Sequence, residues 1–168
     1  MGMDSARLSA RIRQPGHDQT YRTSESNFST ALTEILPSAD WEVVDHPKDL
    51  LQMIDGVFGI RPEASIRLRE SGRVFYFEVK KQGPGGNADE RACKHHTTEF
   101  YRRLAAETRM PYHCFATIMC ENLAVDRRYT VKHLYFFEAD HYFLWADYEL
   151  QPLADYLAML TERYIAAP

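Results

Sequence analysis

Apolar residues follow a helical period at two places in the chain. At the first, the apolar positions follow the pattern i, i+3, i+4, i+7 and i+8 and end just before Pro37. They are Phe28, Ala31, Leu32, Ile35 and Leu36. This spacing predicts a short amphipathic helix that ends at the proline. The second is residues 152–166, where the same period predicts a closing helix with one apolar face. The apolar positions of that face are Leu153, Tyr156, Leu157, Leu160 and Tyr164.

Other apolar runs are short and rich in β-branched and aromatic residues, which favours strands. Residues 41–44 predict a brief strand, and residues 47–54 predict a helical turn. Residues 64–68 and 74–77 flank the turn-forming sequence Glu-Ser-Gly-Arg, which predicts a β-hairpin whose second strand ends on Glu78, Val79 and Lys80. Residues 134–137 and 142–145 predict two further strands.

The segment between the hairpin and these last strands changes its period. After the glycine-rich break at residues 83–86, Asn87 can cap a helix that continues to Met110 and Pro111. Residues 112–120 form a continuous apolar run, typical of a buried strand, and the strand–helix–strand order places it parallel to the hairpin's second strand. The pattern predicts an α/β fold, with a mixed central sheet flanked by α-helices.

Length and composition indicate one domain without a membrane span. A chain of 168 residues with 45% hydrophobic content is the size of one ordinary domain, which we take as residues 1–168. Residues 1–25 show no sustained period and predict a loosely ordered arm, or one that contacts a partner subunit. No apolar run is long enough to cross a bilayer, and no secretory signal is evident, so we expect a cytoplasmic protein of a prokaryotic cell.

Cysteine usage agrees with that compartment. Cys93, Cys114 and Cys120 are too few and too irregularly spaced for a disulfide framework or a zinc site. We expect thiols that are mostly buried.

Charge is distributed unevenly along the chain, although the formal net charge is only −4. Residues 61–109 hold 11 Lys and Arg against 7 Asp and Glu, a net charge of +4, whereas the segments on either side each carry −4. A basic middle third flanked by acidic segments is compatible with a nucleic-acid partner.

Two carboxylates and a lysine in this basic third form a candidate catalytic set. Glu63 and Glu78 lie at the two ends of the predicted hairpin, so both can reach the same edge of the sheet. Lys80 shares a strand face with Glu78, because side chains alternate with a period of two. Oxygen ligands of this kind suit Mg²⁺, which would offset their repulsion, and a lysine can orient or help deprotonate a water. Taken alone, a Glu-x-Lys triplet is also common on solvated strand faces.

The start of the following helix carries side chains that can contact bases. Asparagine pairs with the N6 and N7 atoms of adenine, arginine donates to purine N7, and glutamate accepts from an amino group. Asn87, Glu90 and Arg91 provide these three types within one turn and a half. The alternative is a surface helix in which Asn87 is the cap, Glu90 completes a capping box and Arg91 is solvated.

The sequences E-V-K-K-Q-G and G-N-A-D-E-R together resemble the PD-(D/E)xK nucleases, in particular the EcoRI-like and MunI-like type II restriction endonucleases. The resemblance covers residues 61–96. It implies that Glu63 and Glu78 bind Mg²⁺, that Lys80 assists catalysis, and that a homodimer cleaves double-stranded DNA at a palindrome. Pro62-Glu63 replaces the Pro-Asp of the family, and Asp55 is the competing first metal ligand.

The resemblance also implies how DNA is contacted. Asn87, Glu90 and Arg91 would contact the adenines of an inner AATT, with Gly86 and Ala88 in the same segment. Apart from the resemblance, Lys81, Lys94, Arg102 and Arg103 are candidate phosphate contacts, and the alternative for each is a plain surface charge. MunI-like enzymes have an arginine where this chain has Gly85, so a site with no flanking requirement, or one met by another loop such as Arg127-Arg128, is expected. A PD-(D/E)xK repair nuclease and a DNA-binding protein with impaired catalysis are the alternative functions.

Overall fold

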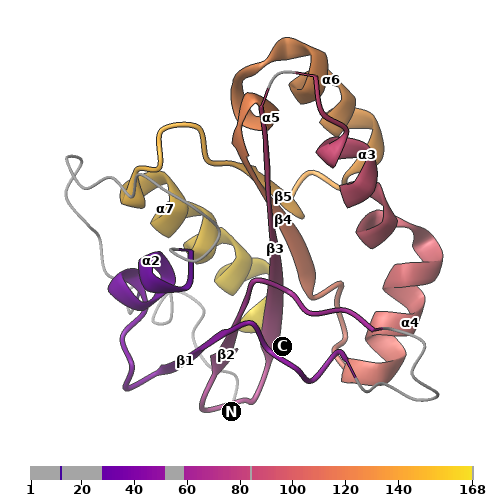
Figure 1. The fold of residues 1–168 in the computed structure, drawn as a ribbon. Coiled ribbons are helices and arrows are strands. Elements are labelled where there is room, and N and C mark those ends of the chain that lie inside the picture. The colour runs from indigo at the N-terminus through magenta and orange to yellow at the C-terminus, as the bar shows by residue number, and fades with distance from the viewer. Residues whose placement is uncertain (1–11, 13–27, 52–58, 84, 168) are drawn as a thin grey trace.

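A five-stranded sheet forms the centre of the protein (Figure 1). The computed structural model describes residues 12, 28–51, 59–83 and 85–167. The strands are β1 (Trp41–Asp45), β2 (Ala64–Leu68), β3 (Val74–Gln82), β4 (Phe115–Glu121) and β5 (Tyr142–Leu144). The helical elements are α2 (Phe28–Ile35), α3 (Ala88–Ala92), η3 (Cys93–His96), α4 (Thr98–Thr108), α5 (Asn122–Val125), α6 (Arg127–Phe136), α7 (Leu150–Leu160) and η4 (Thr161–Ile165).

The sheet is mixed, as the apolar pattern predicts. Its spatial order is β1-β2-β3-β4-β5; the pairs β1–β2 and β2–β3 are antiparallel, and the pairs β3–β4 and β4–β5 are parallel. The parallel pairing of β3 with β4 follows from the helical crossover between them. The predicted α/β fold with a mixed central sheet is therefore confirmed.

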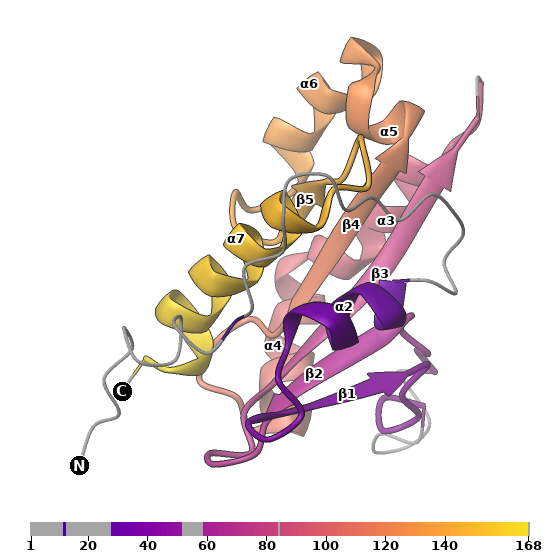
Figure 2. The same cartoon turned by 90° about the vertical axis from the view of Figure 1, so that its left-hand side faces the viewer.

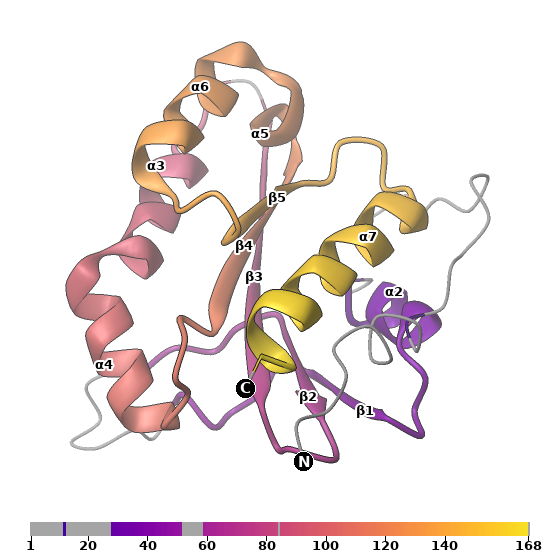
Figure 3. The ribbon, with the colours of Figure 1, turned by 180° about the vertical axis from the view of Figure 1, so that it is seen from behind.

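Helices cover both faces of the sheet. Helices α2 and α7 lie side by side on one face, and α3 and α4 lie on the other (Figures 1, 2 and 3). Alternation along β3 serves both layers: Phe77 meets Phe28 of α2 at 5.5 Å between ring centroids, whereas the adjacent Glu78 lies on the α4 face. On that second face, Phe115 of β4 meets Phe100 of α4 at 5.3 Å.

The single helix predicted from Asn87 to Met110 is wrong in one respect. The structure divides it into α3, a 3₁₀ turn η3 and α4, because Thr97 adopts an extended backbone with φ −84° and ψ 150°. The Thr97 side chain then accepts a hydrogen bond from the Phe100 amide and caps α4 as a new helix. The helix ends at Arg109, which has a left-handed backbone, close to the predicted boundary.

The strand predicted at residues 134–137 is also wrong. Leu134, Tyr135 and Phe136 form the last turn of α6, a helix that begins after Asp126, whose side chain accepts from the Arg128 amide. The aromatic run does not indicate a strand here. Strand propensity reflects packing on a half-buried sheet, whereas these three residues are exposed at the end of a helix.

The other predicted elements are confirmed within the described residues. These are the helix ending before Pro37, the strand at Trp41, the hairpin with Gly72 at φ 71°, the buried β4, the strand at Tyr142 and the closing helix, which continues into a π-helical turn. The helical turn predicted at residues 47–54 is described only to residue 51, and all of the arm except the buried Ile12 lies outside the described residues.

The prediction that the cysteines are mostly buried is confirmed. Cys114 and Cys120 are buried and Cys93 is half-buried, and the three form no disulfide. No helix within the described ranges is long and apolar enough to cross a bilayer.

Buried histidines fill the layer between the sheet and α4. The His96 ring bonds to the Thr117 hydroxyl at 2.7 Å. The His113 ring stacks on Tyr101, at 3.4 Å, and packs at a tilt against His141, at 4.4 Å between ring centroids. Burial lowers the pKa of His95 and of His96 from 6.5 to about 3, and that of His113 to about 2. These imidazoles are therefore neutral in the folded protein at neutral pH.

This packing predicts a loss of stability in mild acid. The histidines have a higher pKa in the unfolded chain, so unfolding takes up protons below pH 6.5 and the free energy of unfolding falls as the pH drops from 6.5 toward about 3. The expected fall is roughly 1.4 kcal/mol per histidine for each pH unit. Urea unfolding at several pH values between 7.5 and 5 measures it, and His113→Phe should reduce the slope by one histidine's share. An unchanged free energy over this range contradicts the prediction.

Candidate functional site

The register of β2 and β3 places the backbone positions of the two candidate carboxylates. Ala64, the first residue of β2, pairs with Phe77 of β3; Glu63 directly precedes Ala64 and Glu78 directly follows Phe77. Residues opposite one another in an antiparallel pair direct their side chains to the same face, about 5 Å apart at Cβ. The register therefore brings the two backbone positions to the same part of the sheet, and the convergence of the two carboxylates stays a prediction.

Both carboxylates are largely shielded from water. The exposed fraction of the side chain is 16% for Glu63, 12% for Glu78 and 24% for Lys80. The Lys80 ammonium forms an ion pair with Glu78, its neighbour two residues away on the same strand face. A lysine, a carboxylate on the same strand and a second carboxylate on the next strand thus share one patch of the α4 face.

His46 is a member of this site that the sequence did not reveal. Its Nε2 lies 3.1 Å from Glu63 Oε2 and its Nδ1 lies 3.1 Å from Asp45 Oδ2. The His46 amide also donates to the Glu63 carbonyl at 2.9 Å, which extends the pairing of β1 with β2 by one residue beyond Asp45 and Ala64. His46 has a left-handed backbone with φ 46°. An imidazole in this position holds the Glu63 side chain in place.

The donor set fits a hard divalent cation. Magnesium prefers oxygen ligands and is usually held by one or two carboxylates, with waters or substrate phosphates in the remaining positions. Glu63 and Glu78 provide such a pair on one face. Among the described residues no group of three or more His, Cys, Asp and Glu side chains is arranged to hold a metal ion. Asp55, the competing ligand, lies outside the described residues.

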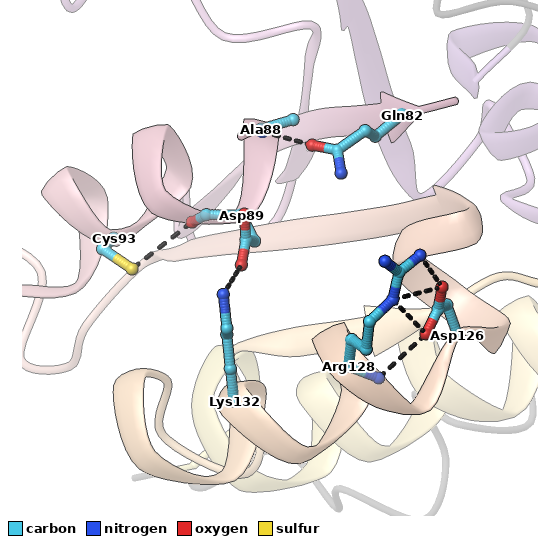
Figure 4. A network of polar contacts seen from close by, with 7 residues as sticks. All are labelled: Gln82, Ala88, Asp89, Cys93, Asp126, Arg128 and Lys132. Atoms are coloured by element: carbon cyan, nitrogen blue, oxygen red, sulfur yellow. Dashed lines mark hydrogen bonds and ion pairs between the residues drawn. The ribbon is translucent and has the colours of Figure 1, made fainter. Parts of the chain in front are cut away.

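The next residue on the same face of β3 connects this patch to the predicted base-contacting segment. Gln82 follows Lys80 by two positions, and its Oε1 accepts a hydrogen bond from the Ala88 amide at the start of α3 (Figure 4). Gly86 lies against the same side chain, because a Cβ built there would be 2.6 Å from Gln82 Cγ and Cδ. Gln82 therefore fixes where α3 begins relative to Lys80.

The predicted base-contacting residues are exposed on α3 and at its start. Asn87, Glu90 and Arg91 are all exposed, and the Asn87 side chain makes no capping hydrogen bond, so the capped-helix alternative lacks the contact that defines it. The Ala88 side chain is buried. Its neighbour Gly86 is exposed.

The predicted phosphate contacts Lys81 and Lys94 are also exposed. Lys81 lies on the opposite face of β3 from Lys80, as the alternation requires. Arg102 and Arg103 both bond to Glu99, at 2.8 and 2.7 Å, so their charge is partly balanced within α4.

An ion pair between a buried aspartate and an exposed lysine holds α3 from the other side. Asp89 is 5% exposed, and its Oδ2 lies 3.3 Å from Nζ of Lys132 in α6 (Figure 4). The sequence around Asn87 does not indicate that Asp89 is buried while its neighbour Glu90 is exposed. Lys132, the partner of Asp89, is 43 positions away. Such a pairing is visible only once α6 has been placed.

Gly85 has a conformational reason for being glycine. Its φ is +83°, in the left-handed region that side chains rarely adopt, and nothing lies within 4 Å of a Cβ built there. An arginine here would be strained by its backbone and would not be excluded by its neighbours. Arg127 and Arg128, proposed as an alternative loop, are instead the first residues of α6, and Arg128 pairs with Asp126 at 2.6 Å.

Of the comparisons with known proteins, the one with solved structures bears on the fold. No protein-family model and no curated protein matches the sequence. A solved structure with a similar fold is the crystal structure of MunI restriction endonuclease in complex with cognate DNA, with a TM-score of 0.64 and 18% sequence identity over 82% of this chain and 87% of that one. At this identity the likeness establishes a restriction-endonuclease-like fold. The site residues stay predictions.

The contact between Gly86 and Gln82 predicts a position-specific effect of a single methyl group. Gly86→Ala should lower the free energy of unfolding by roughly 1–3 kcal/mol, because the buried Gln82 side chain must move. Gly83→Ala is the matched control, since nothing lies within 4 Å of a Cβ there, and it should change stability by less than about 0.5 kcal/mol.

A double-mutant cycle in urea assigns the cause. In the Gln82→Ala background, Gly86→Ala should cost clearly less than in the parent protein, because the obstructing side chain is gone. Equal costs of Gly86→Ala in both backgrounds would show that the Gln82 contact is not the reason.

Proposed function

We propose that this protein is a Mg²⁺-dependent type II restriction endonuclease, which hydrolyses double-stranded DNA at a palindromic site containing AATT and leaves 5′-phosphates. The observation that carries the proposal is the arrangement on β3. Glu78, Lys80 and Gln82 occupy successive positions of one face, with Glu63 opposite Glu78 and the start of α3 held by Gln82. A set suited to phosphodiester chemistry is thereby joined to a helix suited to contacting bases.

DNA binding is assigned to α3 and to the basic residues around it. Asn87, Glu90 and Arg91 would contact adenines in the major groove, with the two copies in a homodimer each covering half of the palindrome. Lys81 and Lys94 would contact phosphates, which position the duplex and do not distinguish its sequence. The similar fold of MunI restriction endonuclease, crystallised with its cognate DNA, supports this assignment.

Cleavage is assigned to the patch around Lys80. Glu63 and Glu78 would hold Mg²⁺, which when bound stabilises charge on the phosphate and lowers the pKa of water. His46 keeps the Glu63 carboxylate oriented, and Glu78 keeps the Lys80 ammonium in place. Lys80 orients the attacking water and assists its deprotonation as the new P–O bond forms. The bond from phosphorus to the 3′-oxygen breaks, and that oxygen takes up a proton to give a 3′-hydroxyl and a 5′-phosphate.

Lys80→Ala should separate chemistry from binding. We expect cleavage with Mg²⁺ to fall at least about a hundredfold, as for loss of one proton-transfer or charge-stabilising group, while the Kd for an AATT duplex in the absence of Mg²⁺ changes little. Lys81→Ala is the matched control: it should retain the rate at saturating DNA and weaken binding alike for all sequences. Quantitative cleavage and fluorescence anisotropy measure the two properties.

The behaviour of the parent protein in these assays distinguishes the alternative functions. If the parent protein binds the duplex specifically and does not cut it with Mg²⁺, the protein is a DNA-binding protein with impaired catalysis. If the parent degrades plasmid DNA or nicks it at structures without producing discrete fragments, the repair-nuclease alternative holds.

Gly85 predicts the breadth of the recognition site. Because no side chain extends from this position, duplexes of the form NAATTN should be cut at similar rates whatever the outer pair, within about tenfold, the effect of roughly 1.4 kcal/mol. A competition assay with a mixture of all flanking pairs measures the ratios. A strict preference for one outer pair would contradict the four-base site and indicate that another element contacts the flank.

A further inference from the structure

Helix α3 is too short to determine its own orientation. It has five residues, Ala88–Ala92, whereas helices shorter than about 12 residues are marginal in water without further contacts. Its apolar contacts are small, because Ala88 and Ala92 are its members of the cluster shared with β4, α5 and α6, and each contributes one methyl group. Methyl groups fill space but offer little resistance to rotation of a helix about its axis. The orientation of α3 therefore depends on polar contacts.

Two polar contacts at successive residues hold α3 in different directions. The Ala88 amide donates to Oε1 of Gln82 in β3, and because backbone N–H groups point along the helix axis, this contact fixes where the helix begins. Oδ2 of Asp89 lies 3.3 Å from Nζ of Lys132 in α6, at the side of the helix (Figure 4). A contact at the side opposes rotation about the axis.

The two partners of this ion pair differ in exposure. The Asp89 side chain is 5% exposed and that of Lys132 is 44% exposed. A carboxylate removed from water is costly without a cation beside it, whereas an exposed ammonium is hydrated without a partner. Lys132 belongs to a helix whose inner face is buried through Tyr129 and His133, so its backbone is firmly placed. The burial of Asp89 therefore ties α3 to a fixed support.

The rotation of α3 decides which side chains can reach bases. Asp89 is buried with the two alanines, and its neighbours Glu90 and Arg91 are exposed. A rotation of about 20° moves a side-chain end about 6 Å from the helix axis by roughly 2 Å. Contacts to base edges need placement within about 0.5 Å, so a small rotation is enough to lose them.

We propose that the ion pair between Asp89 and Lys132 determines sequence specificity, by fixing the rotation of α3 at which Asn87, Glu90 and Arg91 meet the bases. The inference rests on the proposed function, which assigns α3 to the major groove. Asp89 and Lys132 are positioning residues, because they act through α3. Phosphate contacts do not depend on this rotation, so loss of the pair should reduce discrimination between sequences and leave non-specific binding unchanged.

Asp89→Ala tests the proposal by its effect on discrimination. The variant removes the contact and leaves a hydrated lysine, so we expect its urea unfolding midpoint to stay close to that of the parent. Fluorescence anisotropy without Mg²⁺ gives the Kd for an AATT duplex and for duplexes with one inner pair replaced. One replaced pair should raise the Kd of the parent about tenfold or more, and that of the variant by less than about threefold, because the Kd for AATT itself rises.

The Lys132 side distinguishes charge from packing, and carries the test even if Asp89→Ala does not fold. Lys132→Met leaves a buried carboxylate without a cation and should lower both discrimination and stability. Lys132→Arg retains the cation and should discriminate like the parent. Asp140→Ala is the matched control, because Asp140 pairs with Arg163 at 2.7 Å just before β5 begins, whereas α3 follows the end of β3, and β3, β4 and β5 run parallel. It should leave discrimination unchanged.

Three results would overturn the positioning role. They are an Asp89→Ala variant that discriminates like the parent, an equal loss of discrimination in Asp140→Ala, and a non-specific Kd that rises as much as the specific one. A parent that binds every duplex alike would count against recognition of AATT, and this role would fall with it. A parent that binds AATT selectively without cutting would count only against the nuclease, because no step of the test involves cleavage.

Discussion

The alternation of side chains along β3 is the constraint on which the arrangement depends. One face of this strand carries Glu78, Lys80 and Gln82 in succession, so the distance from the carboxylates to the start of α3 is set by a rigid backbone in the middle of the sheet. The opposite face carries Phe75, Phe77 and Val79 into the main core. A shift of one residue in register would exchange the two sets, burying charge and exposing phenylalanine. The core and the site therefore specify the same register.

Two contacts between residues far apart in the sequence hold further parts of the candidate site in place. His46, beyond the end of β1, holds Glu63 against the hairpin, and Lys132 of α6 holds Asp89 of α3. Behind them, neutral histidines fill the layer under α4, with His96 bonded to Thr117, the residue that pairs with Glu78 on the next strand. In the proposed function, the sheet carries the chemistry and α3 carries the DNA contacts. In this chain, polar contacts in the second layer fix their relative position.

The sequence allowed the elements with strong local signals to be predicted. The hairpin, the buried β4 and the shared face of Glu78 and Lys80 follow from periods of two, and the helix ending before Pro37 follows from a period of 3.6. The break at Thr97 could not be predicted, because a cap within a continuous helical pattern depends on local backbone geometry. The helical state of Leu134 and Tyr135 was not predicted either. His46 and Lys132 were missed for a different reason. Their partners are 17 and 43 positions away, and no local pattern carries that information.

In the proposed function, residues on one face of the sheet cut DNA at a place determined by the helix attached to it. The most direct measurement is to incubate the protein with a fully sequenced phage DNA and Mg²⁺ and to determine every end by sequencing. The account predicts ends at one fixed offset within palindromes containing AATT, each with a 5′-phosphate, and no ends when Mg²⁺ is removed by chelation. Ends distributed without regard to sequence, or an intact phage DNA in the presence of Mg²⁺, would contradict it.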